Sequence, residues 1–198
     1  HNLRVLKPIA GATYNKLSAP PAGQVSAALS FMEMFLEGND LAIWINGLLD
    51  DLDWGEEGSN RFEAAMHALG NYLGFGSQRP EVTSGLGPDN LWALGGLKYL
   101  VIECKSGAVS ADKISKGDTN QLNGSTIWFS KKYDQECTMT PIMVHPKTSF
   151  EHAASPHPEL RIVNRPGLQK LRDAVQAYSV ALAAAGGFKD AREVERQL

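Results

Sequence analysis

Residues 87–105 read Gly-Pro-Asp-Asn-Leu-Trp-Ala-Leu-Gly-Gly-Leu-Lys-Tyr-Leu-Val-Ile-Glu-Cys-Lys, and this stretch decides the fold. Two apolar runs, 91–94 and 99–102, flank Gly95-Gly96, which is typical of a β-hairpin with a primed turn. Counting outward from the glycines places Asp89 within about one residue of Glu103 on the paired strand. Because strand side chains alternate between faces, a β-bulge or a three-residue turn is needed to bring both carboxylates to one face. We therefore predict such an irregularity in the hairpin.

The end of the second strand carries a charged pair. Glu103 and Lys105 lie two positions apart, so their side chains share one face while Ile102 and Cys104 share the other. Two converging carboxylates, from Asp89 and Glu103, make an oxygen site of the kind that Mg²⁺ prefers. Such a cation activates water and offsets charge on a phosphoryl oxygen, and Lys105 can orient the water or stabilise the phosphate. This is the chemistry of phosphodiester hydrolysis.

Helices and further strands are expected around the hairpin. Apolar residues at helical spacing predict helices over 24–37, 41–52, 61–73, 116–133 and 168–185. Short strands are expected from Gly76 to Thr83, at 139–144 and at 160–163. The order of elements favours an α/β or α+β protein, and we expect the α/β class with a central mixed β-sheet flanked by helices. We divide the chain into 1–57, a Pro- and Gly-rich arm with a helical extension, and 58–198, the domain that holds the sheet.

The hairpin motif resembles that of a known superfamily. Pro88-Asp89, then thirteen residues, then Glu103-Cys104-Lys105 is similar to the signature of the PD-(D/E)XK nucleases, and the similarity covers residues 60–163. The resemblance implies a restriction-endonuclease-like core of order α-β-β-β-α-β and a metal-dependent nuclease, an endodeoxyribonuclease acting on DNA. It also implies Mg²⁺, with Mn²⁺ able to substitute, held by Asp89, Glu103 and the backbone carbonyl of Cys104, while Lys105 positions water.

Two further residues match less specific parts of that family's site. Glu63, on the helix before the hairpin, corresponds to an acidic residue that assists the metal, although Asn60 to Glu63 also has the spacing of a helix capping box. Gln121 corresponds to a glutamine that some members carry on the helix after the lysine strand. The aromatic residue that follows that glutamine by four positions in those members is Ser125 here, and Gln121 could also be an ordinary polar helix residue.

The net charge bears on the partner. Nineteen basic and twenty-two acidic side chains give −3, which on its face disfavours a polyanionic partner. An acidic cluster accounts for more than this charge: Asp50, Asp51, Asp53, Glu56 and Glu57. Residues 98–132, in contrast, carry six lysines against three acidic residues. The lysines expected to follow nucleic-acid phosphates, unless they only belong to solvated helix faces, are Lys113, Lys116, Lys131 and Lys132.

Other interpretations remain open at this point. His67 lies four residues after Glu63, but two ligands without a third favour a surface or core histidine over zinc. A metal-free enzyme would require His145 or His157 to approach Asp89. The alternative from another class is a catalytically inactive module of the same fold that binds nucleic acid or a protein.

The cellular setting is inferred from composition. No apolar run reaches eighteen residues, so a soluble chain without a membrane partner is expected. Cys104 and Cys137 fit neither a disulfide framework nor a zinc spacing, which favours the cytoplasm. The chain begins with His1, which suggests a piece of a larger protein. The resemblance implies a fused or associated helicase or ATPase module in a restriction or antiviral defence system, and no oligomeric state is indicated.

Overall fold

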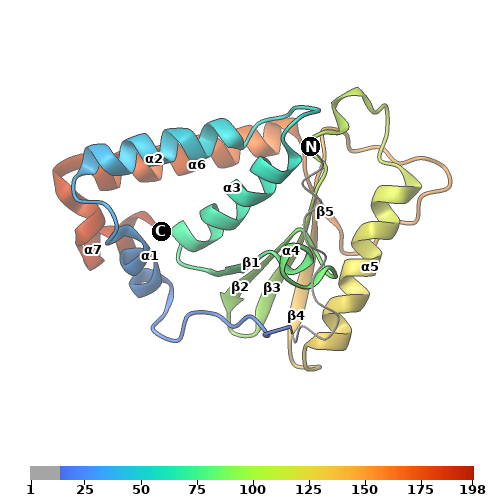
Figure 1. Ribbon diagram of the computed structural model, residues 1–198, viewed down its shortest axis with the longest axis horizontal. Coiled ribbons are helices and arrows are strands. Elements are labelled where there is room, and N and C mark those ends of the chain that lie inside the picture. The colour runs from blue at the N-terminus through green and yellow to red at the C-terminus, as the bar shows by residue number, and fades with distance from the viewer. Residues whose placement is uncertain (1–13) are drawn as a thin grey trace, which may run out of the picture.

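A five-stranded mixed sheet lies at the centre of the protein, whose computed structural model describes residues 14–198 (Figure 1). Its strands, in order across the sheet, are β1 (Gly76–Gln78), β2 (Asn90–Gly95), β3 (Lys98–Cys104), β4 (Thr138–Val144) and β5 (Arg161–Val163). The first three form an antiparallel meander, and β4 and β5 continue the sheet in parallel. Helix α5 (Lys116–Lys132) makes the crossover from β3 to β4. The expected α/β class with a mixed sheet is confirmed.

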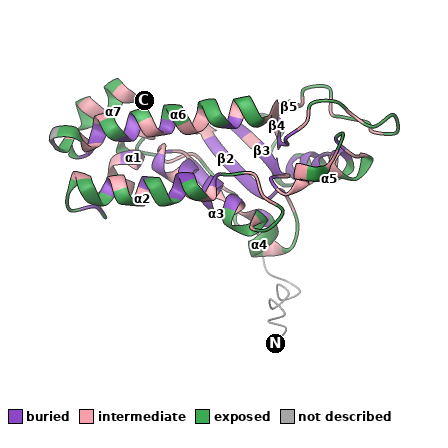
Figure 2. Ribbon diagram, turned by 90° about the horizontal axis from the view of Figure 1, so that it is seen from above, coloured by how far each residue is buried: buried purple, intermediate pink, exposed green. Residues whose placement is uncertain are grey.

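Helices cover both faces of this sheet. The remaining elements are α1 (Gln24–Met32), α2 (Gly38–Asp51), α3 (Ser59–Tyr72), α4 (Pro80–Ser84), the 3₁₀ turn η1 (Ala108–Ser110), α6 (Arg165–Ala183), the 3₁₀ turn η2 (Ala184–Lys189) and α7 (Ala191–Gln197). One hydrophobic core joins α1, α2, α3, α6 and α7 to one face of the sheet, and a second joins α5 to the other face. Figure 2 shows the buried residues along the strands and on the helix sides that face them.

The N-terminal helices share a core with the C-terminal ones. Leu41 and Ile45 of α2 are fully buried together with Leu182 of α6. At Gly38 a Cβ atom would lie 2.4 Å from the carbonyl oxygen of Ala183, so only glycine allows α2 to begin this close to the end of α6. Because of this packing, residues 24–51 lie in the same core as α3 and α6. The domain boundary at residue 57 stays a prediction, and Pro8 and Gly11 of the expected arm lie outside the described residues.

Several predicted element boundaries are wrong for local reasons. The helix expected over 24–37 ends at Met32, because Glu37 and Asp40 form the capping box that begins α2. The strand expected as far as Thr83 ends at Gln78, since Pro80 lacks an N–H for the sheet and begins α4 instead. Helix α7 was not predicted. Within residues 14–198 no helix is both long and apolar enough to cross a membrane.

Candidate active site

The turn of the β2–β3 hairpin sets the register of the site. The two central turn residues are Gly96 and Leu97, with φ of 55° and 59°, instead of the Gly95-Gly96 pair expected from the sequence. From this turn a regular ladder would pair Asp89 with Cys104. The register shifts between Ala93 and Gly95, however, and beyond this bulge Asn90 pairs with Ile102, which brings Asp89 opposite Glu103. The predicted bulge is confirmed, and it places both carboxylates on one face.

Asp89 lies just before β2 and is buried, with 4% of its surface exposed. Its Oδ2 atom accepts a hydrogen bond of 2.7 Å from the backbone N–H of Cys104, at the end of β3. The next residue, Asn90, is fully buried and donates from its side chain to the backbone carbonyl of Glu63 on α3. These two contacts fix the start of β2 between α3 and the end of β3. The Asp89 carboxylate is therefore held by the backbone N–H of Cys104 and by its position next to β2.

Glu103 is fully buried on the face of β3 that α5 covers. Its Oε1 atom accepts a hydrogen bond of 2.6 Å from the hydroxyl of Ser125 on α5. Among the described residues, no donor is hydrogen-bonded to its buried Oε2 atom, and the cation within ion-pair distance is Nζ of Lys105, 3.9 Å away. Burial and the neighbouring Asp89 raise the pKa of Glu103 to about 8. A buried carboxylate oxygen without a partner is costly, so this position favours a cationic ligand.

Lys105 follows β3 directly and points along the same face as Glu103. Its backbone N–H donates to the carbonyl of Val144 on β4, and its ammonium donates to Oε1 of Gln121 at 2.5 Å. The structure therefore brings Asp89, Glu103, Lys105 and Gln121 together from three elements. Their catalytic roles stay predictions.

Glu63 also reaches this group, but it is paired. Its carboxylate binds the guanidinium of Arg79, which also donates to the side chain of Asn60 at 2.9 Å. Helix α3 begins after Gly58, and Asn60 makes no capping contact, so the capping box considered for Asn60 and Glu63 is absent from the structure. Burial and the nearby Asp89 raise the pKa of Glu63 despite Arg79. Glu63 is therefore one of a crowded set of carboxylates.

The sequence alone did not indicate Glu81. This residue lies on α4, and burial followed by its interaction with Asp89 raises its pKa. The backbone N–H of Glu81 donates to the carbonyl of Pro88, which ties α4 to the residue before Asp89. The sequence pattern predicts a strand at this position, whereas the structure has helix α4. The only available signal was Pro80, a residue that favours the first turn of a helix.

These side chains surround a cavity of about 390 Å³. It is lined by Glu56, Ser59, Glu63, Glu81, Asp89, Cys104, Lys105, Gly107, Ala108 and Gln121. Glu103 lies next to Lys105 and Asp89, which both line the cavity. Four carboxylates and one ammonium line this cavity, so it favours a cation.

The oxygen donors at this site can be compared with the ligands that a divalent cation requires. Among the described residues, no three His, Cys, Asp or Glu side chains are arranged as a ready-made metal centre. Two features nevertheless suit a ligand that supplies positive charge. Among the described residues, no donor is hydrogen-bonded to the Oε2 atom of Glu103, and the pKa values of Glu63, Glu81 and Glu103 are raised. Mg²⁺ binds few protein ligands and accepts backbone carbonyls, so Asp89, Glu103 and the carbonyl of Cys104 form a chemically suitable set.

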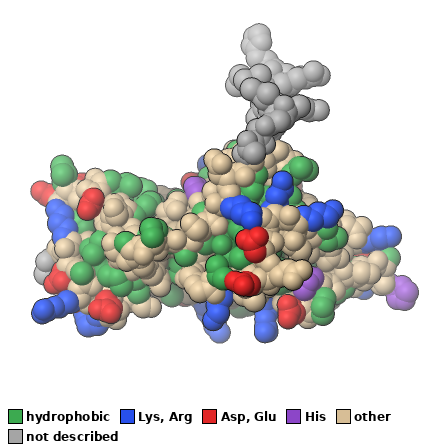
Figure 3. Space-filling view, turned by 90° about the horizontal axis from the view of Figure 1, so that it is seen from below, with side chains coloured by type: hydrophobic (Ala, Val, Ile, Leu, Met, Phe, Trp, Pro, Cys, Tyr) green, Lys and Arg blue, Asp and Glu red, His purple; other side chains and the backbone are tan. Residues whose placement is uncertain are grey.

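The four lysines expected to contact phosphates do not form one patch. Lys113 precedes α5, Lys116 is its first residue, and Lys131 and Lys132 are its last two. The helical rise from Lys116 to Lys131 is about 22 Å. All four side chains are exposed. Gln121 places the site nearer to Lys116 than to Lys131. Figure 3 shows basic and acidic side chains interspersed on the face seen from below, without a large area of one sign.

The histidines do not join the site. His67 is bound through Nδ1 to the hydroxyl of Ser77 at 2.9 Å, which agrees with a packed histidine. His145 is fully buried after β4 and accepts the backbone N–H of Lys147, while His157 lies beside α5 in a separate hollow. Neither His145 nor His157 lines the cavity of Asp89, which removes the metal-free alternative that depends on them.

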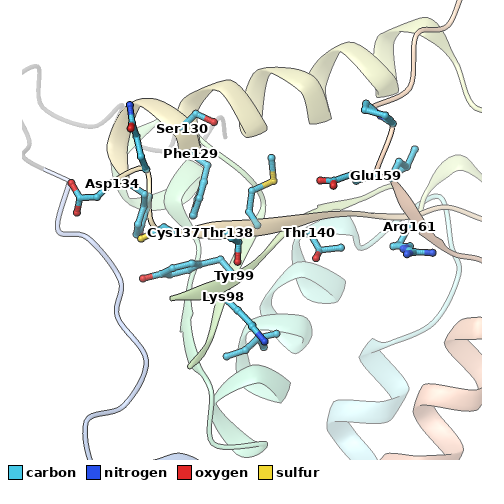
Figure 4. A pocket seen from close by; sticks show the side chains of 16 residues that line it. Lys98, Tyr99, Phe129, Ser130, Asp134, Cys137, Thr138, Thr140, Glu159 and Arg161 are labelled. Atoms are coloured by element: carbon cyan, nitrogen blue, oxygen red, sulfur yellow. The ribbon is translucent and has the colours of Figure 1, made fainter. Parts of the chain in front are cut away.

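A larger cavity, of about 940 Å³, lies at the opposite end of the strands (Figure 4). It surrounds the start of β4, and the side chains labelled there include Lys98, Tyr99, Phe129, Ser130, Thr138, Thr140, Glu159 and Arg161. Its charges are mixed, and it contains neither Asp89 nor Lys105. The smaller cavity is the better candidate for catalysis, because it holds the convergent carboxylates with raised pKa values.

Comparisons with protein-family models, with curated proteins and with solved structures give no match.

Proposed function

We propose that this chain is a Mg²⁺-dependent nuclease domain that hydrolyses phosphodiester bonds, with DNA as its substrate. The observation that carries the proposal is the Glu103 carboxyl group, which is fully buried opposite Asp89. Its Oε2 atom receives no hydrogen bond from a donor among the described residues and lies 3.9 Å from the Lys105 ammonium. A structural ion pair would place the ammonium in hydrogen-bond contact, whereas here Lys105 is bound to Gln121. The carboxylate and the ammonium are thus both kept available for a third group.

Each residue has a definite task in this proposal. Asp89 and Glu103, with the carbonyl of Cys104, hold the cation, and Mn²⁺ can replace Mg²⁺. When bound, the cation supplies positive charge that offsets charge on the phosphoryl group. Lys105 orients the attacking water, because its ammonium is fixed by Gln121 at the cavity wall. Glu63 assists through the cation's water shell, and Arg79 keeps its carboxylate oriented.

The order of elements supports the same proposal. Helix α3, the meander β1–β3, helix α5 and strand β4 follow the order α-β-β-β-α-β that a restriction-endonuclease-like core requires, with α4 inserted after β1. Such a domain would act with a helicase or ATPase module, in the same chain or as a partner, in restriction or antiviral defence. This last step is an analogy from fold to biology.

Cleavage assays test the proposal directly. Labelled single-stranded DNA, duplex DNA and RNA are incubated with the protein in Mg²⁺, Mn²⁺ or EDTA. We expect cleavage of DNA with either metal and none in EDTA, and a loss of roughly 100-fold or more in Asp89→Asn and in Lys105→Ala. Asn retains an oxygen for the Cys104 N–H, so Asp89→Asn should remain folded. Glu195→Gln and Lys170→Ala, both on exposed helix positions, serve as matched controls.

A catalytically inactive binding module is the second candidate. The absence of a ready-made group of three metal-binding side chains in the described residues favours it. Wild-type protein that binds nucleic acid but cuts none of the substrates with either metal would establish this second candidate and refute the first.

A further inference from the structure

The loop between α2 and α3, residues 52–58, forms one wall of the candidate active site. Glu56 of this loop and Ser59, at the start of α3, line the cavity together with Gly107 and Ala108 from the segment that follows Lys105. The sequence identified this loop only as an acidic cluster. In the structure it lies against the segment that carries the proposed catalytic lysine.

Two hydrogen bonds fasten the loop to that segment. The backbone N–H of Gly55 donates to the carbonyl of Ser106 at 3.2 Å, and the hydroxyl of Ser110 donates to Oε1 of Glu56 at 2.5 Å. The two backbones are also in close contact, since a Cβ on Gly107 would lie 3.5 Å from the carbonyl oxygen of Gly55. No strand of nucleic acid can pass between backbones at this distance.

The other end of the loop is anchored to α3 and α6. Trp54 packs against Phe62 with ring centroids 6.4 Å apart, and the guanidinium of Arg165 lies 5.4 Å from the Trp54 ring. Asp53 is 3.5 Å from the guanidinium of Arg172. Because the loop is held on both sides, it is a fixed wall and not a flap.

The loop also places a negative charge, the Glu56 carboxylate, at the cavity. Glu56 is exposed, and it lines the cavity as does Glu81 from α4. Arg172 pairs with Asp53, whereas no described cation lies within ion-pair distance of Glu56. A phosphate leaving the cavity on this side would meet the Glu56 carboxylate, which repels it.

Substrate bound in the middle of a strand must leave the cavity in two directions. The cavity volume of about 390 Å³ lies at the lower end of the range for small-molecule sites. The buried Oε2 atom of Glu103 receives no hydrogen bond from the described residues and lies beside Lys105, which lines the cavity, so it is a second feature that suits a ligand at this site. The loop and Glu56 form the side of the cavity next to residues 106–110, where a continuous strand extending past the site would meet them.

We propose that the α2–α3 loop restricts the site to the terminal nucleotides of a strand, with Glu56 as the specificity-determining residue. The inference rests on the proposed nuclease function and replaces the endonucleolytic mode implied by the resemblance with attack at strand ends. The substrate class is thus a nucleic-acid strand with a free end, which engages few phosphates on this chain. A weak dependence on salt follows, because few counterions are released.

A comparison of linear and covalently closed single-stranded DNA of the same sequence tests this inference. Cleavage is measured in Mg²⁺ and Mn²⁺, and binding is measured separately by anisotropy in Ca²⁺. We expect wild type to cut the linear strand at least ten times faster than the circle and to bind it more tightly. Glu56→Gln should reduce this preference several-fold. Glu57→Gln is the matched control. It removes the same charge from the next residue, whose side chain does not line the cavity, and it should leave the preference for the linear strand unchanged.

The outcomes separate the inference from the function. Equal cleavage of circle and linear strand by wild type, or an unchanged preference in Glu56→Gln, overturns the inference while the nuclease function stands. Tighter binding of the linear strand without any cleavage refutes the nuclease function and supports the end-specific site. If the wild-type protein neither binds nor cleaves either DNA, the result refutes both the nuclease function and the end-specific site.

Discussion

The hydroxyl of Ser125 on α5 donates a hydrogen bond of 2.6 Å to the carboxylate of Glu103 on β3. Both residues are buried, with 4% and 0% of their surfaces exposed. Ser125 takes the position at which some members of the superfamily that the sequence resembles have an aromatic residue, and its hydroxyl contacts the proposed metal ligand. Helix α5 therefore fixes both charged groups of β3, Glu103 through Ser125 and Lys105 through Gln121.

Ser125→Ala should weaken both the fold and the site. Loss of the donor leaves a second oxygen of Glu103 buried without a partner, which costs about 1–3 kcal/mol of unfolding free energy. It also raises the pKa of Glu103 further, because the Ser125 hydrogen bond favours the charged form. Urea unfolding measures the loss of stability, and Mg²⁺ titration of the folded protein measures the weakening of the site. Ser130→Ala removes a hydroxyl that donates only to the backbone of α5, so it should change neither.

Gln121 is expected to act through Lys105 alone. Gln121→Ala should slow cleavage about tenfold, at the lower end of the effects of residues that orient another site group. In a Lys105→Ala background the same substitution should cost nothing further, since the ammonium it positions is gone. Single-turnover rates with excess protein give the double-mutant cycle, and Asn120→Ala, on an exposed neighbouring position, is the control. Additive losses would show that Gln121 contacts the substrate independently.

Pattern and spacing predicted much of the site. Glu103 and Lys105 could be placed on one strand face from their separation alone, and the bulge followed from the requirement that Asp89 share that face. The position of the hairpin turn was harder to predict than the bulge. Gly95-Gly96 is the stronger turn signal, yet the turn is centred one residue later, at Gly96 and Leu97, because the bulge takes up the extra residue.

Contacts between distant elements account for what the sequence could not show. Ser125 and Glu56 approach the site only because α5 packs across β3 and because the α2–α3 loop lies against Ser106 and Ser110. No periodicity encodes these approaches. The pattern does not indicate Glu81 for a local reason, because Pro80 begins a short helix where the pattern predicts the end of a strand.

Leu97 offers a test of the hairpin turn. Its φ of 59° is the left-handed conformation, which costs a non-glycine residue roughly 1–2 kcal/mol, and asparagine tolerates it better. Leu97 is 48% exposed, so Leu97→Asn loses little burial and should stabilise the protein by about 0.5–1 kcal/mol. Thermal unfolding measures the change. Leu36→Asn, at an exposed leucine without positive φ, should give no gain. A loss of stability in Leu97→Asn would contradict the turn geometry.

His145 should make the fold sensitive to acid. It is fully buried after β4, and its Nε2 atom has no hydrogen-bond partner within residues 14–198. Burial lowers its pKa below the ordinary value of 6.5. The charged groups around it act in both directions, since Asp118 favours the protonated ring while Lys105 and Lys147 disfavour it.

The sign of the effect follows from linkage. The unfolded chain takes up a proton on this histidine near pH 6.5, whereas the folded protein does so only at lower pH. Stability contributed by the neutral ring is therefore present above pH 6.5 and is lost as the pH falls toward the folded pKa. In His145→Asn the side-chain oxygen can still accept the N–H of Lys147, so the variant should fold with a flatter pH profile between 7 and 5. Urea midpoints across this range give the profile, and His152→Asn, at an exposed loop position, should retain the wild-type slope. Parallel profiles for wild type and His145→Asn would show that His145 is not the acid-sensitive group.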